Sequence, residues 1–199
     1  QRKLESKVSD SEKEDLNFMG NSAKRLTRLM AELSDFFKLG NDLPAREDVD
    51  TRHMLQKLVN RVEPVVKETE GEIQLSGNFP KLWAHQELLR TAFSELIDNA
   101  INFRGEKALK LDISYSEDKD NHIFSFKDYG MGIHPAYAPK IFRIFYQIDP
   151  YASQAGVGIG LAKVRKILRI YRGEAIADGQ ENEFTQIRLK LPKLEVLHK

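Results

Sequence analysis

Three polar residues, Glu95, Asn99 and Asn102, are spaced four and then three positions apart. In a helix this spacing places all three side chains on one face. The Asn99 oxygen could ligate Mg²⁺, which prefers few protein oxygens together with water and substrate phosphates. Glu95, one turn earlier, could orient or deprotonate a nucleophile near a γ-phosphate. The alternative is a solvated polar face, because exposed helices commonly carry such residues.

A second group begins at Asp128, at the end of an expected strand, and continues with Gly130 and Gly132. A fixed carboxylate there can accept a hydrogen bond from the 6-amino group of adenine. Guanine presents an acceptor at that position, so the same carboxylate would repel it. The two glycines would let the backbone approach the base closely. A simple turn before glycine explains Asp128 but not the repeated glycine pair.

A third group is the alternating run Gly156, Gly158 and Gly160, which is followed by Leu161. Backbone amides at the start of a helix can converge on phosphate oxygens, helped by the positive end of the helix dipole. The chain contains no Gly-Lys-Ser/Thr sequence, so this run is not a P-loop. It is not a dinucleotide fingerprint either, because Leu161 occupies the third glycine position and no strand leads directly into the run.

Positive charge is scarce around this glycine run. No Lys or Arg occurs between Arg143 and Lys163. The charge of a bound triphosphate would therefore be offset by Mg²⁺, by backbone amides and by Arg104 or Arg143. We expect modest nucleotide affinity that depends strongly on Mg²⁺. The five histidines are scattered without metal-ligand spacing, which favours structural roles for them.

The elements that must position these groups follow from periodicity. Residues 13–39 are predicted to form one long amphipathic helix with a heptad seam, made by Leu16, Met19, Ala23, Leu26, Met30, Leu33 and Phe37. Phe18, Leu29 and Phe36 widen the seam, which suits a four-helix bundle built with other helices. The alternative is a helix packed on its own globular domain. Residues 41–50 are predicted to be a linker.

A compact α/β pattern follows the linker. Helices are expected at about residues 51–61, 86–103 and 160–171, with a short helical piece near 140–145, and strands at 73–75, 82–83, 109–115, 122–127, 174–177 and 184–191. The second of these helices carries Glu95 and Asn99, and one of the strands ends just before Asp128. The pattern predicts that all three polar and glycine-rich groups belong to one α/β domain.

Composition limits the partners and the compartment. The chain has 199 residues, a net charge of +1 and no cysteine. A neutral chain has no bulk attraction to nucleic acid or to an anionic membrane, and no apolar run is long enough to span a bilayer. The absence of cysteine fits a reducing, cytoplasmic location. Because the chain begins with Gln1, we expect it to be a fragment of a longer protein.

Together these residues resemble the ATP-binding domain of sensor histidine kinases, within the superfamily of DNA gyrase, heat-shock chaperones and mismatch-repair ATPases. The local pattern is most similar to phytochrome-type kinases. The matching motifs are Glu95–Arg104 for the N box, Asp128–Ile133 for the G1 box, Ile141–Tyr146 for the F box and Gly156–Leu161 for the G2 box. The resemblance implies a two-layer α/β sandwich of the Bergerat type and an ATP lid over residues 133–155. It also implies γ-phosphoryl transfer from Mg-ATP to histidine, with Ile133 among the nucleotide-binding residues.

The sequence departs from the family pattern in three places. No histidine occurs in residues 1–40, so the phosphoacceptor box is missing and the chain is not expected to autophosphorylate alone. Asn102 stands where the family often has Lys, and Val157 where it often has Thr. Each change removes a group that would be near the phosphates.

The resemblance also implies a domain organisation and partners. Residues 1–40 would be the end of a dimerisation hairpin, mostly its second helix, followed by the linker, an ATP-binding domain over 51–192 and a tail over 193–199. We expect a homodimer through residues 13–39, a response regulator receiver domain as partner, and no direct contact with nucleic acid or membrane. Two alternatives remain open: a degenerate, non-catalytic docking module, and an anti-sigma-type serine kinase, against which the heptad helix argues.

Overall fold

A computed structural model of the chain describes residues 10–148 and 157–193. It divides into two compact units, residues 1–38 and residues 39–199. The first unit contributes one helix, α1 (Asp10–Lys38), close to the helix expected over 13–39. Large apolar side chains of this helix are exposed: Leu16, Phe18, Met19, Leu26, Met30 and Phe37. Within the described residues, no helix combines the length and apolar character needed to cross a bilayer.

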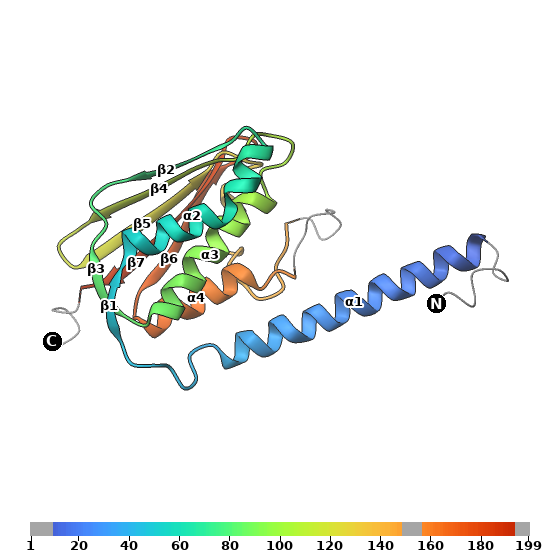
Figure 1. Cartoon of the computed structure of the whole chain (residues 1–199), viewed down its shortest axis with the longest axis horizontal. Coiled ribbons are helices and arrows are strands. Elements are labelled where there is room, and N and C mark those ends of the chain that lie inside the picture. Colours follow the sequence, from blue (N-terminus) through green and yellow to red (C-terminus); the bar gives the residue numbers. More distant parts are fainter. Residues whose placement is uncertain (1–9, 149–156, 194–199) are drawn as a thin grey trace. The chain divides into compact units, whose positions relative to one another are not determined.

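The second unit is a two-layer α/β structure, seen in Figure 1 as a sheet with helices over one face. Its elements are β1 (Glu47–Asp50), α2 (Thr51–Glu68), β2 (Glu72–Ser76), β3 (Lys81–Ala84), α3 (Gln86–Asn102), β4 (Lys110–Glu117), β5 (Asn121–Asp128), a 3-10 turn (Pro135–Tyr137), α4 (Gly160–Ile170), β6 (Glu174–Gln180) and β7 (Phe184–Pro192). The expected α/β fold with one long preceding helix is confirmed.

The main sheet has the strand order β2-β4-β5-β7-β6. β2 pairs parallel to β4, and the other pairs are antiparallel. The side chains of β7 alternate between half-buried and buried along its whole length, as expected of a strand with one face on a core. Its buried residues are Thr185, Ile187, Leu189 and Leu191. The core therefore lies between this sheet face and the helices, and it holds α3 and α4 in place.

The helix α3 is the central support of the domain. Its apolar residues recur at three- and four-residue intervals and are buried: Leu88, Leu89, Ala92, Phe93, Leu96, Ile97 and Ala100. Phe93 packs against Phe124 and Phe126 of β5, with ring centroids 5.2 Å and 5.6 Å apart. Because one face of α3 is fixed to β5, its polar residues have defined positions.

Some sequence-based boundaries were wrong. Residues 41–50 were predicted to be a linker, and β1 lies at the end of this range, where it pairs with β3. The helix expected at 51–61 runs to Glu68 and contains Pro64. The helical piece expected near 140–145 is absent from the described chain, where this stretch forms turns and Phe145 has a positive φ of 62°.

Candidate nucleotide site

Asp128 ends β5 and is 7% exposed. It lies in register with Thr185 of β7, another buried polar residue. One carboxylate oxygen of Asp128 accepts a hydrogen bond from the backbone N–H of Gly130 at 3.1 Å. Burial raises the pKa of Asp128 to about 6, against the opposing effects of the Gly130 N–H and the charge of Lys107. The carboxylate is thus dry and fixed, as recognition of a base amino group requires.

The turn after Asp128 is packed tightly between two other loops. A Cβ atom added at Gly130 would overlap the carbonyl oxygen of Phe103, and one added at Gly132 would overlap that of Gln180. Gly132 also has a φ of +66°, in the left-handed region that favours glycine. The backbone N–H of Met131 donates to the Phe103 carbonyl at 2.9 Å. Both glycines are therefore required by close backbone approach within the protein itself.

Lys107 was not predicted as a site residue. Its ammonium donates to the carbonyl oxygens of Gly130 at 2.7 Å and Asn182 at 2.8 Å, with a longer contact to Tyr129 at 3.5 Å. This ammonium joins the turn after β5 to the turn between β6 and β7. The residue gave no sequence signal, because its partners are backbone carbonyls distant along the chain.

On α3, Glu95 is half-buried and forms an ion pair. Its Oε1 lies 3.0 Å from the ammonium of Lys163 on α4, with 24% of the Glu95 side chain and 15% of the Lys163 side chain exposed. Asn99 is half-buried, and in the described part of the chain no side-chain hydrogen bond involves its carboxamide. Asn102 is exposed at the end of the helix. The polar face therefore carries the paired Glu95 carboxylate and, one turn later, the Asn99 amide, for which the described residues supply no hydrogen-bond partner.

The glycine run enters α4. Gly160 is the first residue of the helix, and the N-cap Ile159 offers no side-chain acceptor to the first amides. Gly158 has a φ of +75°, and its carbonyl accepts a hydrogen bond from the Phe145 N–H at 2.8 Å. Leu161 is half-buried against the core. Uncapped helix amides are donors for an anion such as phosphate. Gly156 lies outside the described residues.

Two arginines proposed to offset phosphate charge differ in position. Arg104 follows α3, and its backbone lies against Gly130. Its buried Nε has no hydrogen-bond partner in the described chain, while Nη1 donates to the Ile101 carbonyl at 3.2 Å. Arg143 is exposed, and its charge lowers the pKa of Arg165 after the larger effect of burial and that of Arg169. Arg104 is thus the arginine beside the turn that follows Asp128.

No group of three or more His, Asp or Glu side chains among the described residues could hold a metal ion. The only predicted donor for Mg²⁺ with an uncommitted oxygen in that part of the chain is Asn99. A single carboxamide fits an ion that takes its other ligands from water and phosphate.

Two surface cavities lie elsewhere. One, of about 280 Å³, is lined by Arg46, Ile170, Tyr171 and Arg172, and the other, of about 410 Å³, by Asn78, Pro80, Tyr115, Ser116 and Glu117. None of the predicted site residues lines either cavity. They therefore add nothing to the site built around Asp128.

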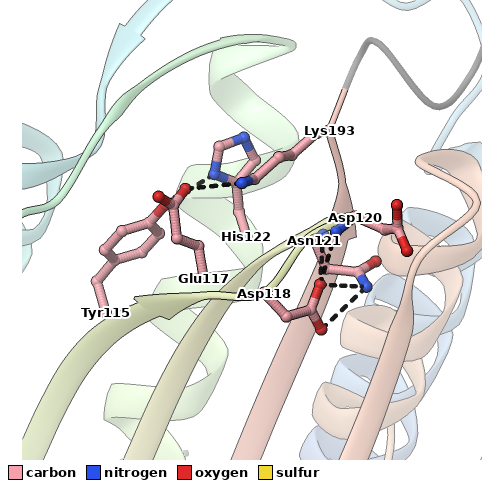
Figure 2. Close-up of polar contacts among 7 residues, drawn as sticks. All are labelled: Tyr115, Glu117, Asp118, Asp120, Asn121, His122 and Lys193. Carbon is pink, nitrogen blue, oxygen red and sulfur yellow. Dashed lines mark hydrogen bonds and ion pairs between the residues drawn. The ribbon is translucent and has the colours of Figure 1, made fainter.

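The polar cluster in Figure 2 lies at the other end of β4 and β5 from Asp128. The Tyr115 hydroxyl is 2.8 Å from Nδ1 of His122, and Lys193 forms an ion pair with Glu117 at 3.0 Å. Burial is the main cause that raises the pKa of Tyr115 to about 12 and lowers that of His122. The cluster ties the end of β7 to the β4–β5 hairpin and is separate from the candidate site.

Comparison with known proteins identifies the family of this chain. Residues 84–195 match the family described as histidine kinase-, DNA gyrase B-, and HSP90-like ATPase. The phytochrome-like protein Cph1 of Synechocystis is 25% identical over 193 residues, covering 95% of this chain and 26% of that protein. The sensor protein kinase WalK of Staphylococcus epidermidis is 28% identical over 184 residues, covering 89% of this chain and 30% of that protein. The chain thus spans less than a third of the length of these relatives.

Solved structures show the same fold. Full-length ShkA in complex with AMPPNP matches 95% of this chain and 40% of that one with a TM-score of 0.73 at 23% identity. The Acinetobacter baumannii histidine kinase AdeS matches 94% of this chain and 86% of that one with a TM-score of 0.68 at 22% identity. At these identities the similarity concerns the fold, and it confirms the Bergerat-type architecture.

Proposed function

Because this chain belongs to the family of histidine kinase-, DNA gyrase B- and HSP90-like ATPases, we propose that it is the catalytic part of a sensor histidine kinase. In this proposal it binds Mg-ATP and positions the γ-phosphoryl group for transfer to a histidine, for relay to a response regulator. The acceptor is not in residues 1–40, which contain no histidine. The observation that carries the proposal is the buried Asp128 carboxylate, held by the Gly130 amide beside a glycine turn.

Asp128 selects adenine by accepting a hydrogen bond from its 6-amino group. A buried acceptor opposite the guanine oxygen would leave two acceptors unpaired, which disfavours that base. Gly130 and Gly132 keep the backbone in place without side chains, and the buried Ile133 offers an apolar surface to the base. Base recognition thus depends on the end of β5 and the turn that follows it.

The phosphates bind at the start of α4. The amides of Gly158, Gly160 and Leu161, with Gly156, donate to phosphate oxygens, and Arg104 supplies a positive charge from the end of α3. Asn102, at the exposed end of the same helix, is a neutral donor to the phosphate chain. Uncapped amides and one arginine give modest charge compensation, so we expect binding to require a divalent cation.

Asn99 would hold Mg²⁺, which when bound would neutralise charge on the phosphates. Glu95 orients the attacking imidazole or takes up its proton. For this role the Glu95 carboxylate must leave its ion pair with Lys163. The protein otherwise acts by positioning and electrostatic stabilisation, as in phosphoryl transfer generally.

The partners follow from the same proposal. The exposed apolar side chains of α1 would be covered by a second copy of the chain, forming a dimer within a helical bundle. The receiver domain of a response regulator would accept the phosphoryl group. The location would be cytoplasmic, without direct membrane contact by this part of the protein.

Calorimetric titration tests the proposal. The parent chain should bind ATP with Mg²⁺ and much more weakly in excess chelator. Asp128→Asn should weaken Mg-ATP binding about 10- to 100-fold, the effect of a lost hydrogen bond to a charged group. Asp118→Asn is the matched control, because it removes the same charge from an exposed turn at the other end of β4 and β5.

Absence of ATP binding by the parent chain would favour the non-catalytic docking module. Equal affinity with and without chelator would exclude the proposed role of Asn99.

A further inference from the structure

Lys163 and Glu95 form the least exposed ion pair among those in the described residues. The other pairs of the domain include Arg61–Asp98, with both side chains 45% exposed, and Lys110–Glu72, with 48% and 49% exposed. Shielding from water strengthens an ion pair. Removing one partner of a shielded pair also costs more stability than removing one partner of an exposed pair. The Lys163–Glu95 contact is therefore a defined feature of the interface between α3 and α4.

The pair lies at the entrance of α4. Lys163 is in the first turn of this helix, and helical side chains lean toward the N-terminus. Glu95 reaches the same place from α3, because a Cβ atom added at Gly160 would lie 2.5 Å from its Oε2. The carboxylate thus lies beside helix amides that have no side-chain cap, a position that favours an anion. Glu95 occupies the region in which phosphate oxygens are proposed to bind.

Charge in this region is otherwise low. No Lys or Arg occurs in residues 144–162, so Lys163 is the first cation after the glycine run. Asn102, on the same α3 face as Glu95, is neutral. An incoming triphosphate carries several negative charges and meets, at the start of α4, the Glu95 carboxylate, the Lys163 ammonium and the helix amides, with Arg104 as the other proposed cation. Phosphate and Glu95 then compete for the same ammonium.

We propose that Lys163 is a phosphate-binding residue of the nucleotide site, and that it exchanges its Glu95 partner for phosphate oxygens when Mg-ATP binds. The exchange releases the Glu95 carboxylate, which becomes available to orient the acceptor imidazole. This inference rests on the proposed function, since it concerns the same ATP site. It gives the site a cation, which the sequence of residues 144–162 does not supply.

The test compares the parent chain with Lys163→Gln, Lys163→Arg and Glu95→Gln. Binding of Mg-ATP is measured by calorimetry, and binding of adenosine by NMR chemical shifts. Lys163→Gln should weaken Mg-ATP binding about tenfold or more and leave adenosine binding unchanged, while Lys163→Arg keeps the charge and the affinity. Glu95→Gln should strengthen Mg-ATP binding severalfold, because it removes the competitor for the ammonium.

The opposite signs of the two neutral variants separate this proposal from a merely structural pair. If the pair only joins α3 to α4, both variants should lower the thermal unfolding midpoint and affect ATP and adenosine alike. Unchanged Mg-ATP affinity in Lys163→Gln would overturn the inference and leave the proposed function standing. Absence of binding to both ligands by the parent chain would overturn the proposed function as well.

A second measurement covers the case in which Lys163→Gln does not fold. Lysines of the parent chain are labelled by reductive ¹³C-methylation, and Lys163→Arg identifies the Lys163 signal by its loss. Mg-ATP should shift this signal and adenosine should not. A Lys163 signal that is unmoved by Mg-ATP would contradict the proposal.

Discussion

The buried position of Asp128 disfavours the ionised form of its carboxylate. Burial removes water from the carboxylate, and one backbone N–H with a nearby ammonium does not fully replace it, so the pKa rises from an ordinary 3.8 to about 6. A raised carboxyl pKa means that the folded state binds a proton more tightly than the unfolded chain. Ionised Asp128 therefore destabilises the fold, which favours a role in binding over a role in packing.

The raised pKa of Asp128 predicts a specific pH dependence of the free energy of unfolding. The contribution of Asp128 to the free energy of unfolding should decline as the pH rises from about 4 to about 6 and stay unfavourable above that. Asp128→Asn should remove this decline and stabilise the chain at pH 7.5 by on the order of 1 to 3 kcal/mol. Urea unfolding of both proteins between pH 4.5 and 7.5 measures the difference. A difference that does not change with pH would show that Asp128 titrates normally.

The affinity for ATP should rise with pH, whereas the contribution of Asp128 to stability falls. Only the ionised carboxylate accepts from the adenine amino group without a competing proton. Mg-ATP affinity of the parent chain should therefore fall as the pH drops from 7.5 to 5.5, through the raised pKa of Asp128. In Asp128→Asn the weak residual affinity should lack this component. Calorimetry at matched ionic strength gives the comparison, and parallel pH profiles would count against a role for Asp128 in base recognition.

Lys107 is a positioning residue at the same site. Lys107→Met leaves the carbonyls of Gly130 and Asn182 without their ammonium donor, and it removes a charge that lowers the pKa of Asp128. Because these carbonyls can regain water, we expect a loss of only about 1 kcal/mol in stability. Nucleotide affinity should fall together with a further rise in the Asp128 pKa, measured by NMR titration. Lys107→Arg is the control that keeps the charge.

At the scale of elements, the turn after β5 is shaped by what surrounds it. The loop after α3 approaches it from one side and the β6–β7 turn from the other, where the Asn182 N–H donates to the Met131 carbonyl at 2.6 Å. Two separate segments therefore fix the conformation of this turn. The glycines are therefore a packing requirement as well as a binding one.

Gly132→Ala tests this requirement against a matched control. Gly132 and Gly105 have similar positive φ angles, +66° and +69°. A Cβ atom at Gly105 would meet only the flexible Met131 side chain at 3.4 Å, whereas at Gly132 it would overlap backbone. Gly105→Ala should cost about 1 kcal/mol for the strained φ, and Gly132→Ala clearly more, about 3 kcal/mol. Equal losses in urea unfolding would mean that the turn moves freely away from Gln180.

Periodicity predicted the supporting elements well where local pattern and core packing agree. The apolar stripe of α3 and the alternation along β7 are examples. It failed where tertiary structure overrides local preference. α2 continues through Pro64 because Val66 beyond it packs on the core, and β1 exists only through its pairing with β3. No helix forms near 140–145, where Phe145 has a left-handed φ, because so short a helix has a costly nucleus.

The candidate site was predictable by residue type and spacing but not by contact. The spacing of Glu95 and Asn99 correctly put them on one helical face, and Asp128 ends its strand as expected. The sequence did not indicate that Glu95 is paired. Lys163 is 68 positions away, and the partners of Lys107 are backbone carbonyls that any residue could supply. Such contacts are made by the fold and leave no local pattern.

At the scale of the whole molecule, residues 1–38 and 39–199 are separate compact units. All predicted nucleotide-site residues lie in the second unit. A chain of residues 39–199 should therefore bind Mg-ATP within about twofold of the parent, by calorimetry. It should also be monomeric in sedimentation at concentrations where the parent is dimeric, because it lacks the exposed apolar face of α1. A large loss of affinity would place part of the site in the helix.

The strand order has a further consequence for how the chain folds. β5 and β7 are neighbours in the sheet, yet residues 129–183, which include α4 and β6, lie between them in sequence. Joining these strands closes a long loop, and the entropy of closure grows only with the logarithm of loop length, about 0.6 kcal/mol for each doubling. Inserting a few residues between β5 and α4 adds a small fraction of that. The length of this connection therefore changes the closure entropy little, and chains with connections of different length should refold at almost unchanged rates.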